Sequence, residues 1–600
     1  MLIRKSFFYL AILIAAPQAW PQSFDFTISM DHPVNHYYHV ELRCDALKGA
    51  SQDFKMPVWM PGYYRIMDYS KDVVNFHAAD AGGHPLASTR IDKNTWRVKL
   101  DESGRAVISY DVYAFTRFVG NSYLDDQRGY FVGPGMYVYV PGMIDHPATV
   151  HIKLPAGWSS VANGLDPVAG EPNTFSAANF DLLYDCPTLL GNQEHFQFEV
   201  NGVPHFIVAE DVPASIDRAR IAADLKRIVA TATGMMGEIP YKHYTFLLMG
   251  RGAGGVEHLT SAAMLFNGES LNTPEGYRRW LSFAAHEYFH TYNVKRIRPI
   301  ALGPFDYDRE NFTTMLWEAE GFTSYYQDLL VERAGLMTPA QYFATLSNNI
   351  STYENSPGHR FQSAAESSIA TWLHGEDAAN TTISYYNKGP AIAAMLDYKI
   401  RAETGNTKSL DDVMRALYEE YFKQKRRGFT DQEFRAVCER MAGTPLDEIF
   451  DDYVATTGDI DYQKYFALAG LKIDTESRAR PGAYLGATAG NSGGRGGRGG
   501  PAPQNGAQVI SRIDYDSPAS RAGLSDGDEI LAIGGERVTN LNDSLRARKP
   551  GERIKILVAR DGRIREIEVE LGSKMERSFK IEPAENPTPL QSSILKGILK

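Results

Sequence analysis

The chain has 600 residues, of which 62 are Lys or Arg and 73 are Asp or Glu, so its formal net charge is −11 at pH 7. This length predicts several domains, each large enough to bury its own core. With 43% hydrophobic and 22% charged residues, the composition excludes general disorder and collagen-like structure. The acidic balance argues against nucleic acid as a partner.

The first 22 residues are predicted to be a signal peptide and not part of the fold. Two basic residues precede a short apolar run at positions 7–16, and small residues follow it, which is the order of a secretory signal. A cut after Ala19 would place Pro17 where a small residue is preferred, so an uncleaved membrane anchor is the alternative. We expect an exported protein of the periplasm or cell envelope, with membrane contact only if the signal is uncleaved.

Only three cysteines occur, Cys44, Cys186 and Cys438. This number excludes a disulfide scaffold, and the odd count leaves at least one thiol unpaired within the chain. An oxidising compartment would permit one bridge, and Cys44 and Cys186 are the pair expected to share a domain.

Residues 23–204 are predicted to form an all-β domain. Segments such as 24–30, 37–44, 106–115 and 148–154 are rich in β-branched and aromatic residues and are bounded by Gly, Pro, Asn or Asp, which is typical of strands. Aromatic residues are enriched in strands because they pack well on the faces of sheets. We therefore interpret the many tyrosines as packing residues and not as a ligand-binding surface.

Residues 205–470 are predicted to form a mainly helical domain. From about residue 216 apolar residues recur at spacings of three and four, so an amphipathic helix is expected with Ser215 as its cap. A short strand at 244–250 and several further helices follow.

The C-terminal part is predicted to be a small β-rich module at 478–574, followed by a loose tail at 575–600. The Gly-rich stretch "GNSGGRGGRGGPAPQNG" at 490–506 has no periodicity and is interpreted as a loop inserted into this module. Its two Arg-Gly-Gly pieces resemble RNA-binding tracts, but two arginines in an acidic protein favour a loop.

A candidate metal site lies in "HEYFH" at 286–290. In a helix, His286 and His290 lie one turn apart on the same face, where both imidazoles can bind one zinc ion with Glu287 beside it. Zinc lowers the pKa of bound water toward about 7, and the glutamate can accept a proton as that water attacks a carbonyl. The motif therefore predicts peptide hydrolysis without a covalent intermediate.

A third protein ligand is needed, because a catalytic zinc usually has three. The segment "MLWEAEGFTSYY" places Glu318 and Glu320 in an aromatic and apolar run, where an unpaired carboxylate is costly to bury. One of them is expected to meet a cation; the alternative is that both face water.

Several motifs resemble one family. "HEYFH" followed by "WEAEGF" resembles the gluzincin metallopeptidases, and "TYNVKRIRP" and "MPVWMPGYYRIMDYSKDV" are similar to the glycyl aminopeptidase family of that group. The resemblance implies that Glu320, not Glu318, completes the site for one zinc ion. It also implies an N-terminal β domain, a thermolysin-like, mainly α catalytic domain and a C-terminal PDZ domain. Peptides with Gly or Ala at the N-terminus are the implied substrates.

Two further matches concern substrate binding. "YYNKGP" resembles the Tyr-x-Lys-Gly signature of the wider aminopeptidase clan, which implies that Tyr386 donates to the oxyanion, a role that suits a neutral phenol. "GAGGVEH" resembles the clan's Gly-x-Met-Glu-Asn strand, which implies that Gly254 and Gly255 bind substrate and that Glu257 faces its free α-amine. The chain departs from that pattern by having Val and His on either side of Glu257.

The segment "SPASRAGLSDGDEILAIGGERV" resembles a PDZ signature. The segment "AYLGA" at 483–487 resembles the carboxylate-binding loop of such domains, with Leu485 and Gly486 at its centre. Such a loop holds the terminal carboxylate of a peptide that adds as an edge strand, so peptide C-termini are candidate partners. The Gly-rich insertion follows this loop directly, which leaves open a purely structural or partner-docking PDZ domain.

Together these features predict an exported zinc aminopeptidase that removes small N-terminal residues. One alternative is a zinc endopeptidase that grips substrate C-termini with its PDZ domain. The other is a PDZ scaffold with a relic catalytic domain. Every proposed catalytic position has a chemically competent residue, which argues against a relic.

Overall fold

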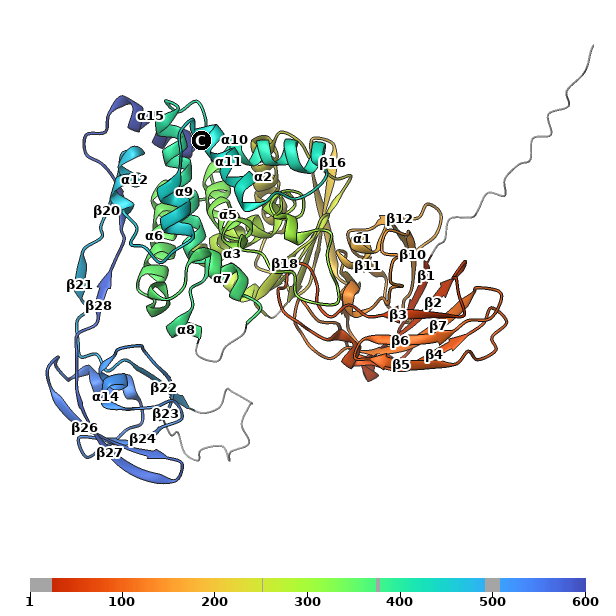
Figure 1. The fold of residues 1–600 in the computed structure, drawn as a ribbon, viewed down its shortest axis with the longest axis horizontal. Coiled ribbons are helices and arrows are strands. Elements are labelled where there is room, and N and C mark those ends of the chain that lie inside the picture. Colours follow the sequence, from red (N-terminus) through yellow and green to blue (C-terminus); the bar gives the residue numbers. More distant parts are fainter. Residues whose placement is uncertain (1–23, 251, 374–377, 492–507) are drawn as a thin grey trace, which may run out of the picture.

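The computed structural model describes residues 24–250, 252–373, 378–491 and 508–600. The expected signal peptide and most of the Gly-rich insertion lie outside these residues. The described chain forms three bodies, with the N-terminal β domain at one side of the catalytic domain and the PDZ domain below the other side (Figure 1). Among the described residues, no helix is long and apolar enough to span a bilayer.

The N-terminal domain is built from packed β-sheets around one core. Burial alternates along its strands, as in β1, where the first, third and fifth residues are buried. The seven-stranded sheet has the order β12-β13-β10-β1-β2-β7-β4. Its strands are β12 Asp166–Pro167, β13 Thr174–Ala177, β10 Ala148–Lys153, β1 Phe24–Ser29, β2 Tyr37–Cys44, β7 Ala106–Tyr113 and β4 Val73–Ala79.

Two smaller sheets complete this domain. One has the order β11-β14-β9-β8 and the other β3-β6-β5. Their strands are β11 Ser160–Ala162, β14 Thr188–Gly191, β9 Gly129–Phe131, β8 Tyr123–Leu124, β3 Ser51–Lys55, β6 Thr95–Lys99 and β5 Ser88–Asp92.

The cysteines of the chain are all free and buried, so the bridge between Cys44 and Cys186 that an oxidising compartment would permit is not formed. The Cys44 thiol instead donates to the Ala106 carbonyl at 3.5 Å. Burial raises the pKa of the Cys44 thiol to about 12, so it stays protonated and inert.

The catalytic domain begins earlier than its sequence suggests. Strand β15 Glu194–Val200 was expected in the N-terminal domain, but it pairs with β16 Val203–Ala209 in a hairpin. Asn201 and Gly202 form the turn with φ of 50° and 80°, the conformation that favours Asn-Gly in a two-residue hairpin. The five-stranded sheet has the order β15-β16-β17-β19-β18, where β17 is Tyr244–Gly250, β18 is Gly254–Glu257 and β19 is Ser261–Phe266.

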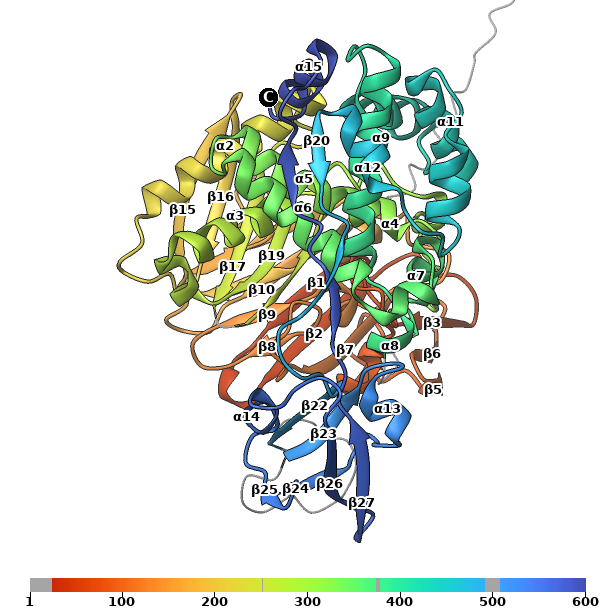
Figure 2. The ribbon, with the colours of Figure 1, turned by 90° about the vertical axis from the view of Figure 1, so that its left-hand side faces the viewer.

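Helices cover this sheet and share a large core with it (Figure 2). The principal ones are α2 Arg218–Met236, α3 Pro274–Phe289, α4 Leu316–Ala319, α5 Gly321–Arg333, α6 Pro339–Glu354, α7 Ala364–Ala370, α8 Ala378–Thr381, α9 Tyr385–Glu403, α10 Leu410–Leu417, α11 Asp431–Ala442 and α12 Tyr462–Leu468. The cap of α2 is Asp217 and not Ser215: the Asp217 side chain accepts from the Ala219 N–H, whereas the Ser215 hydroxyl donates to Asn272.

The PDZ domain has its own core and is carried at the end of a ribbon of two chain segments (Figures 1 and 2). Its sheet contains β22 Ala487–Asn491, β23 Gln508–Ile513, β24 Glu529–Ile533, β25 Glu536–Arg537, β26 Arg553–Arg560 and β27 Arg563–Glu570, with helices α13 Pro518–Ala522 and α14 Leu541–Arg546. The ribbon pairs β20 Leu471–Ile473 with β29 Ile581–Pro583 and β21 Ser477–Ala479 with β28 Met575–Arg577.

The prediction of a loose tail at 575–600 is wrong. Strands β28 and β29 close the ribbon, and helix α15 Pro589–Ile598 packs Ile594 and Ile598, both fully buried, into the catalytic core. The Thr588 and Gln591 side chains form a capping box at the start of α15. The Thr-x-x-Gln spacing and the two isoleucines four residues apart were the sequence signal for this helix.

Candidate active site

Helix α3 carries the first half of the candidate site. Its start is fixed by Pro274 in the first turn and by the Thr273 hydroxyl, which accepts from the Gly276 N–H at 3.0 Å. From there the helix runs uninterrupted through the buried residues His286 and Glu287 to His290 at its C-terminal end. The predicted spacing of one helical turn between the two histidines is therefore present.

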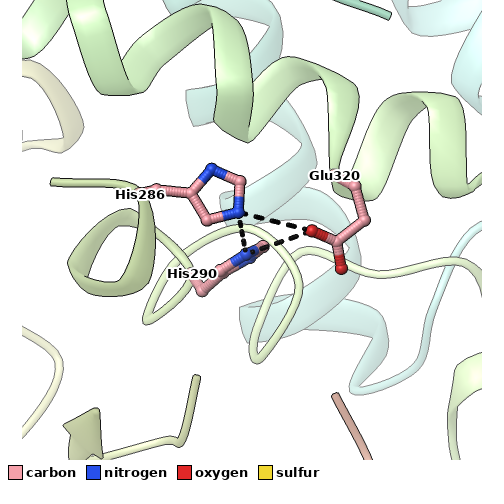
Figure 3. A group of neighbouring side chains, drawn as sticks. All are labelled: His286, His290 and Glu320. Atoms are coloured by element: carbon pink, nitrogen blue, oxygen red, sulfur yellow. Dashed lines mark hydrogen bonds and ion pairs between the residues drawn. The ribbon is translucent and has the colours of Figure 1, made fainter. Parts of the chain in front are cut away.

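Glu320 meets these histidines from the junction of α4 and α5 (Figure 3). The Nε2 atoms of His286 and His290 are 3.0 Å apart, and Glu320 Oε2 lies 3.5 Å from the first and 3.3 Å from the second. All three side chains are buried. They are the one group in the described part of the chain that offers three such ligand atoms within 4.8 Å of one another.

The outer nitrogens of both imidazoles are held by other groups. His286 Nδ1 lies 2.9 Å from Gln327 Oε1, and His290 Nδ1 lies 2.7 Å from the Asn293 carbonyl. Both partners are acceptors, so each ring can keep a proton on Nδ1, which would leave the lone pair of Nε2 for a metal ion when one is bound. This arrangement is the usual support for metal-binding histidines.

The donor set fits a zinc ion. Ligand bonds of about 2.0–2.1 Å in a tetrahedral site place neighbouring donor atoms about 3.3 Å apart, close to the three separations in the triad. Two imidazoles and one carboxylate also form a three-ligand set that leaves one position for water or substrate. His286, His290 and Glu320 therefore satisfy both the distances and the chemistry of a catalytic zinc site.

The electrostatics of the triad also favour a cation. Burial opposes a charge on His290, but the carboxylates of Glu320 and Glu257 raise its pKa to about 9. Burial likewise opposes ionisation of Glu320, yet the charge of His290 and hydrogen bonds from both histidines hold its pKa well below the usual range. The site thus stabilises an ionised carboxylate in a buried place, provided that positive charge lies beside it.

Glu318 lies elsewhere. It is fully buried, and among the residues that the structure describes neither of its carboxyl oxygens has a hydrogen-bond partner. The alternative that both acids of this segment face water is therefore wrong. Burial raises the pKa of Glu318 well above its usual value, which indicates a neutral acid. Of the two candidates, only Glu320 joins the histidines.

A contact between two glycines sets where Glu320 and Tyr386 lie. A Cβ atom on Gly321 would fall 2.5 Å from Gly389 Cα, and one on Gly389 would fall 2.4 Å from Gly321 Cα. Helices α5 and α9 can approach this closely only where neither has a side chain. The contact brings Glu320, at the start of α5, beside Tyr386 in the first turn of α9.

Tyr386 lies against the triad. Its ring centroid is 6.0 Å from that of His286 and 4.8 Å from that of Tyr385, and the residue is 40% exposed. Loss of hydration and the carboxylate of Glu320 both raise the pKa of Tyr386, so its phenol remains a proton donor. Tyr385 is buried and bonded to the Thr371 hydroxyl at 3.0 Å, in agreement with a packing role.

Strand β18 passes directly over Glu287. A Cβ atom on Gly255 would lie 2.2 Å from Glu287 Oε1, so the backbone of this strand forms one wall of the site. Glu287 is 4% exposed, and burial raises its pKa well above the usual value while the charge of His290 opposes that rise. Gly254, with φ of 117°, precedes this contact, and a Cβ atom there would meet Val119 and Phe118 at 3.9 and 4.0 Å. Gly255 therefore lies at the site, whereas Gly254 adjoins it through the chain.

Glu257 ends the same strand with an unpartnered oxygen. The residue is 3% exposed, and in the described part of the chain no group forms a hydrogen bond with its Oε1 atom. The nearest cation, Lys295 Nζ, is 3.9 Å away. A buried carboxylate oxygen without a donor is costly, so Glu257 is placed to receive a donor that the folded chain itself does not supply.

Asp185 of the N-terminal domain anchors Lys295. Its Oδ1 atom lies 2.8 Å from Lys295 Nζ and 3.2 Å from His258 Nδ1, and its Oδ2 accepts from the Leu259 N–H. Burial disfavours its charge, but Lys295 and His258 lower the pKa of Asp185 to about 2. His258 thus belongs to a hydrogen-bonded network around Asp185, and it is absent from the metal-binding group.

The PDZ loop is separate from these residues. Leu485 is buried in the PDZ core, and Gly486 has φ of 78°. No acceptor is found, within the residues described, for the N–H groups of Leu485 and Gly486. The loop therefore retains the free donors that bind a terminal carboxylate in this type of domain.

Sequence reasoning missed four residues around the site: Asp185, Lys295, Gln327 and Gly62, where a Cβ atom would lie 2.9 Å from each carboxylate oxygen of Glu257. Lys295 lies within "TYNVKRIRP" and Gly62 within "MPGYY". Both motifs were noticed in the sequence, but neither showed which residues these two would contact. Asp185 and Gln327 carried no local signal, since each acts on a residue distant in sequence.

Comparison with known proteins agrees with this geometry. Residues 25–192 match the Peptidase M61 N-terminal domain, residues 279–392 match M61 glycyl aminopeptidase and residues 483–571 match a PDZ domain. A search among curated proteins finds no match.

Solved structures are similar over most of the chain. An aminopeptidase N family protein from Idiomarina loihiensis has 28% identity and a TM-score of 0.86, covering 96% of this chain and 100% of that one. An M1 zinc metallopeptidase from Deinococcus radiodurans has 13% identity and a TM-score of 0.47, covering 74% of this chain and 95% of that one.

The predicted three-domain fold and the family resemblance are confirmed by the matched domains and by the first of these structures. With the geometry of its triad, they establish that the chain belongs to the M61 glycyl aminopeptidase family and is a zinc metallopeptidase whose ligands are His286, His290 and Glu320.

Proposed function

We propose that this zinc peptidase is an aminopeptidase that releases small residues, Gly or Ala, from the N-terminus of peptides. The observation that carries the proposal is the buried Oε1 atom of Glu257, which accepts no hydrogen bond from any described residue and lies on the strand beside the triad. The α-ammonium of a peptide is a charged N–H donor that can make the hydrogen bond this oxygen lacks. The preference for small residues rests on the family to which the chain belongs.

Each catalytic role follows from one contact. When bound, zinc lowers the pKa of water and polarises a carbonyl. Glu287, held below the backbone of Gly255, accepts the proton of the attacking water and returns it to the departing amine. Tyr386 donates a hydrogen bond from its phenol O–H to the oxyanion that develops on the substrate carbonyl and keeps its proton. Gly254 and Gly255 expose strand backbone along which the start of the peptide can lie.

The Glu287 role is tested by Glu287→Gln. The substitution removes the base but not a metal ligand, so the variant should retain one zinc ion and lose at least a hundredfold in kcat, the range of general base catalysis. Full activity of a zinc-loaded Glu287→Gln variant would contradict the mechanism.

We further propose that the protein is exported. The support is the order of basic, apolar and small residues in positions 1–22. Export is tested by fractionating the producing cell and sequencing the N-terminus of the mature protein. A full-length chain in the cytoplasm would contradict it, and a full-length chain in the membrane would indicate an uncleaved anchor.

A second candidate function is a zinc endopeptidase that holds substrate C-termini at the PDZ domain. It is supported by the N–H groups of Leu485 and Gly486, for which the described residues provide no acceptor. Titration of a fluorescent peptide with a free or an amidated C-terminus tests the binding step, since only the free carboxylate should bind. A relic scaffold is disfavoured because every proposed catalytic position is occupied by a residue able to perform its role.

A further inference from the structure

Helix α8 of the catalytic domain carries a side chain, Asn380, that pairs with the backbone of the PDZ domain. Asn380 Nδ2 donates to the Ile513 carbonyl at 2.7 Å, and its Oδ1 accepts from the Tyr515 N–H at 2.9 Å. Figure 2 shows α8 at the boundary with the PDZ domain, next to α13. Because Asn380 is 8% exposed, both hydrogen bonds are largely shielded from water, where the loss of a partner is costly.

Two further contacts hold the PDZ domain on the catalytic domain. The rings of Phe361 and Tyr515 pack edge to face with their centroids 5.0 Å apart, a favourable geometry for aromatic side chains. In the ribbon, the Asn355 amide donates to the Arg577 carbonyl at 2.9 Å and accepts from the Arg577 N–H at 3.1 Å. The PDZ domain is therefore anchored at two separate places and does not hang from its ribbon alone.

The residues that follow Asn380 are anchored on the segment that carries Phe361. A Cβ atom on Gly358 would overlap the Thr382 carbonyl oxygen, so the two backbones are in direct contact there. One residue further, the Ile383 N–H donates to a side-chain oxygen of that segment, Gln362 Oε1, at 2.9 Å. The PDZ domain thus rests on both sides of this contact.

This anchored segment leads directly into the first turn of α9. Within the described chain, the N-cap residue Ser384 makes no side-chain hydrogen bond to that turn, so the turn lacks the cap that commonly fixes the start of a helix. Its direction depends instead on the residues before it. Tyr386 lies in this turn, with its ring centroid 6.0 Å from that of His286.

We propose that Asn380 is a positioning residue through which the docked PDZ domain holds Tyr386 at the zinc site. This inference rests on the proposed role of Tyr386 and deepens it. It gives the PDZ domain a part in catalysis that requires no peptide at the loop of Leu485 and Gly486.

Asn380→Ala tests the proposal in the full-length, zinc-loaded enzyme. We expect kcat on a glycyl amide to fall at least about tenfold with KM within about threefold of wild type, because a catalytic group displaced by about 1 Å can cost about 100-fold in rate. In a Tyr386→Phe background, which lacks the phenol O–H, the same substitution should change kcat by less than about twofold, since residues that act together are not additive.

Amide hydrogen exchange gives a second readout that does not depend on turnover. Exchange in residues 384–388 should be about tenfold faster in Asn380→Ala, because the loss of buried hydrogen bonds frees the start of α9 to open. Tyr515→Ala weakens the same contact from the PDZ side and should act in the same direction. Ile564→Ala is the matched control, because Ile564 is 67% exposed in β27 of the same domain and should change neither kcat nor the exchange.

The outcomes separate this inference from the proposed function. A folded Asn380→Ala variant overturns the role of Asn380 if its kcat stays within about twofold of wild type, or if its loss is the same with and without Tyr386→Phe. Either result leaves the proposed aminopeptidase intact. A Tyr386→Phe variant that retains full kcat overturns the proposed role of Tyr386 and this inference together. If Asn380→Ala does not fold, Tyr515→Ala is judged by the same comparison.

Discussion

Substitution of Gly255 by alanine should displace the base without touching a metal ligand. The new Cβ atom would lie 2.2 Å from Glu287 Oε1 and 2.8 Å from a ring carbon of Phe283. Ordinary contact begins near 3.4 Å, so the carboxylate must retreat by about 1.2 Å. A displacement of about 1 Å in a catalytic group lowers the rate about 100-fold, which corresponds to about 2.7 kcal/mol of transition-state stabilisation.

The assay is kcat on a glycyl amide, with zinc content and melting temperature measured on the same preparation. Gly234→Ala is the matched control, because Gly234 lies in helix α2 with no atom within 4 Å of the added carbon; it should retain full activity and gain up to about 1 kcal/mol of stability. The placement of β18 over the base is refuted if Gly255→Ala keeps kcat within threefold of wild type.

Other predictions concern stability. Removing zinc with a chelator should lower the free energy of unfolding by about 4 kcal/mol when free zinc had been a thousandfold above its Kd, and a melting temperature unaffected by chelator and by added zinc would contradict a folded-state site. Lys295→Met leaves the buried carboxylates of Asp185 and Glu257 without their cation and should destabilise by about 3–5 kcal/mol in denaturant titrations, whereas Lys242→Met, whose side chain is 82% exposed, should change stability by less than about 1 kcal/mol; equal effects would refute the network. Burial lowers the pKa of His205 from 6.5 to about 4, so the unfolded chain binds the additional proton and His205 should reduce stability by about 3 kcal/mol as pH falls from 6.5 to 4. His205→Phe should remove that part of the pH dependence, and an unchanged slope would show that His205 is not its source.

The sequence predicted those parts of the site that depend on local geometry. His286, Glu287 and His290 share one helix, so their spacing alone determines which of them face the same side. Glu318 and Glu320 could not be distinguished in this way, because the helix is interrupted at Glu320, between the end of α4 and the start of α5. The direction of Glu320 depends on the contact of Gly321 with Gly389, which joins segments far apart in the chain.

The two misplaced segments had local signals that the wider pattern hid. Strand β15 directly follows the β-rich sequence of the N-terminal domain. Only the Asn-Gly turn after it indicated that it pairs with the next strand, β16. Residues 575–600 contain Pro, Asn and Ser that are typical of a tail, yet the buried isoleucines of α15 outweigh them. In both cases the structure of the segment depends on the distant segment with which it pairs or packs. Local composition does not identify that distant segment.

The central claim is that a free α-amine is recognised at Glu257 beside the zinc site. Initial rates on glycyl amide and N-acetylglycyl amide, measured with wild type and with Glu257→Gln, test it most directly. The account predicts that wild type hydrolyses the free-amine substrate at least a hundredfold faster than the acetylated one, and that Glu257→Gln loses most of this difference while retaining zinc. Equal rates on both substrates with the wild-type enzyme would contradict it and favour an endopeptidase.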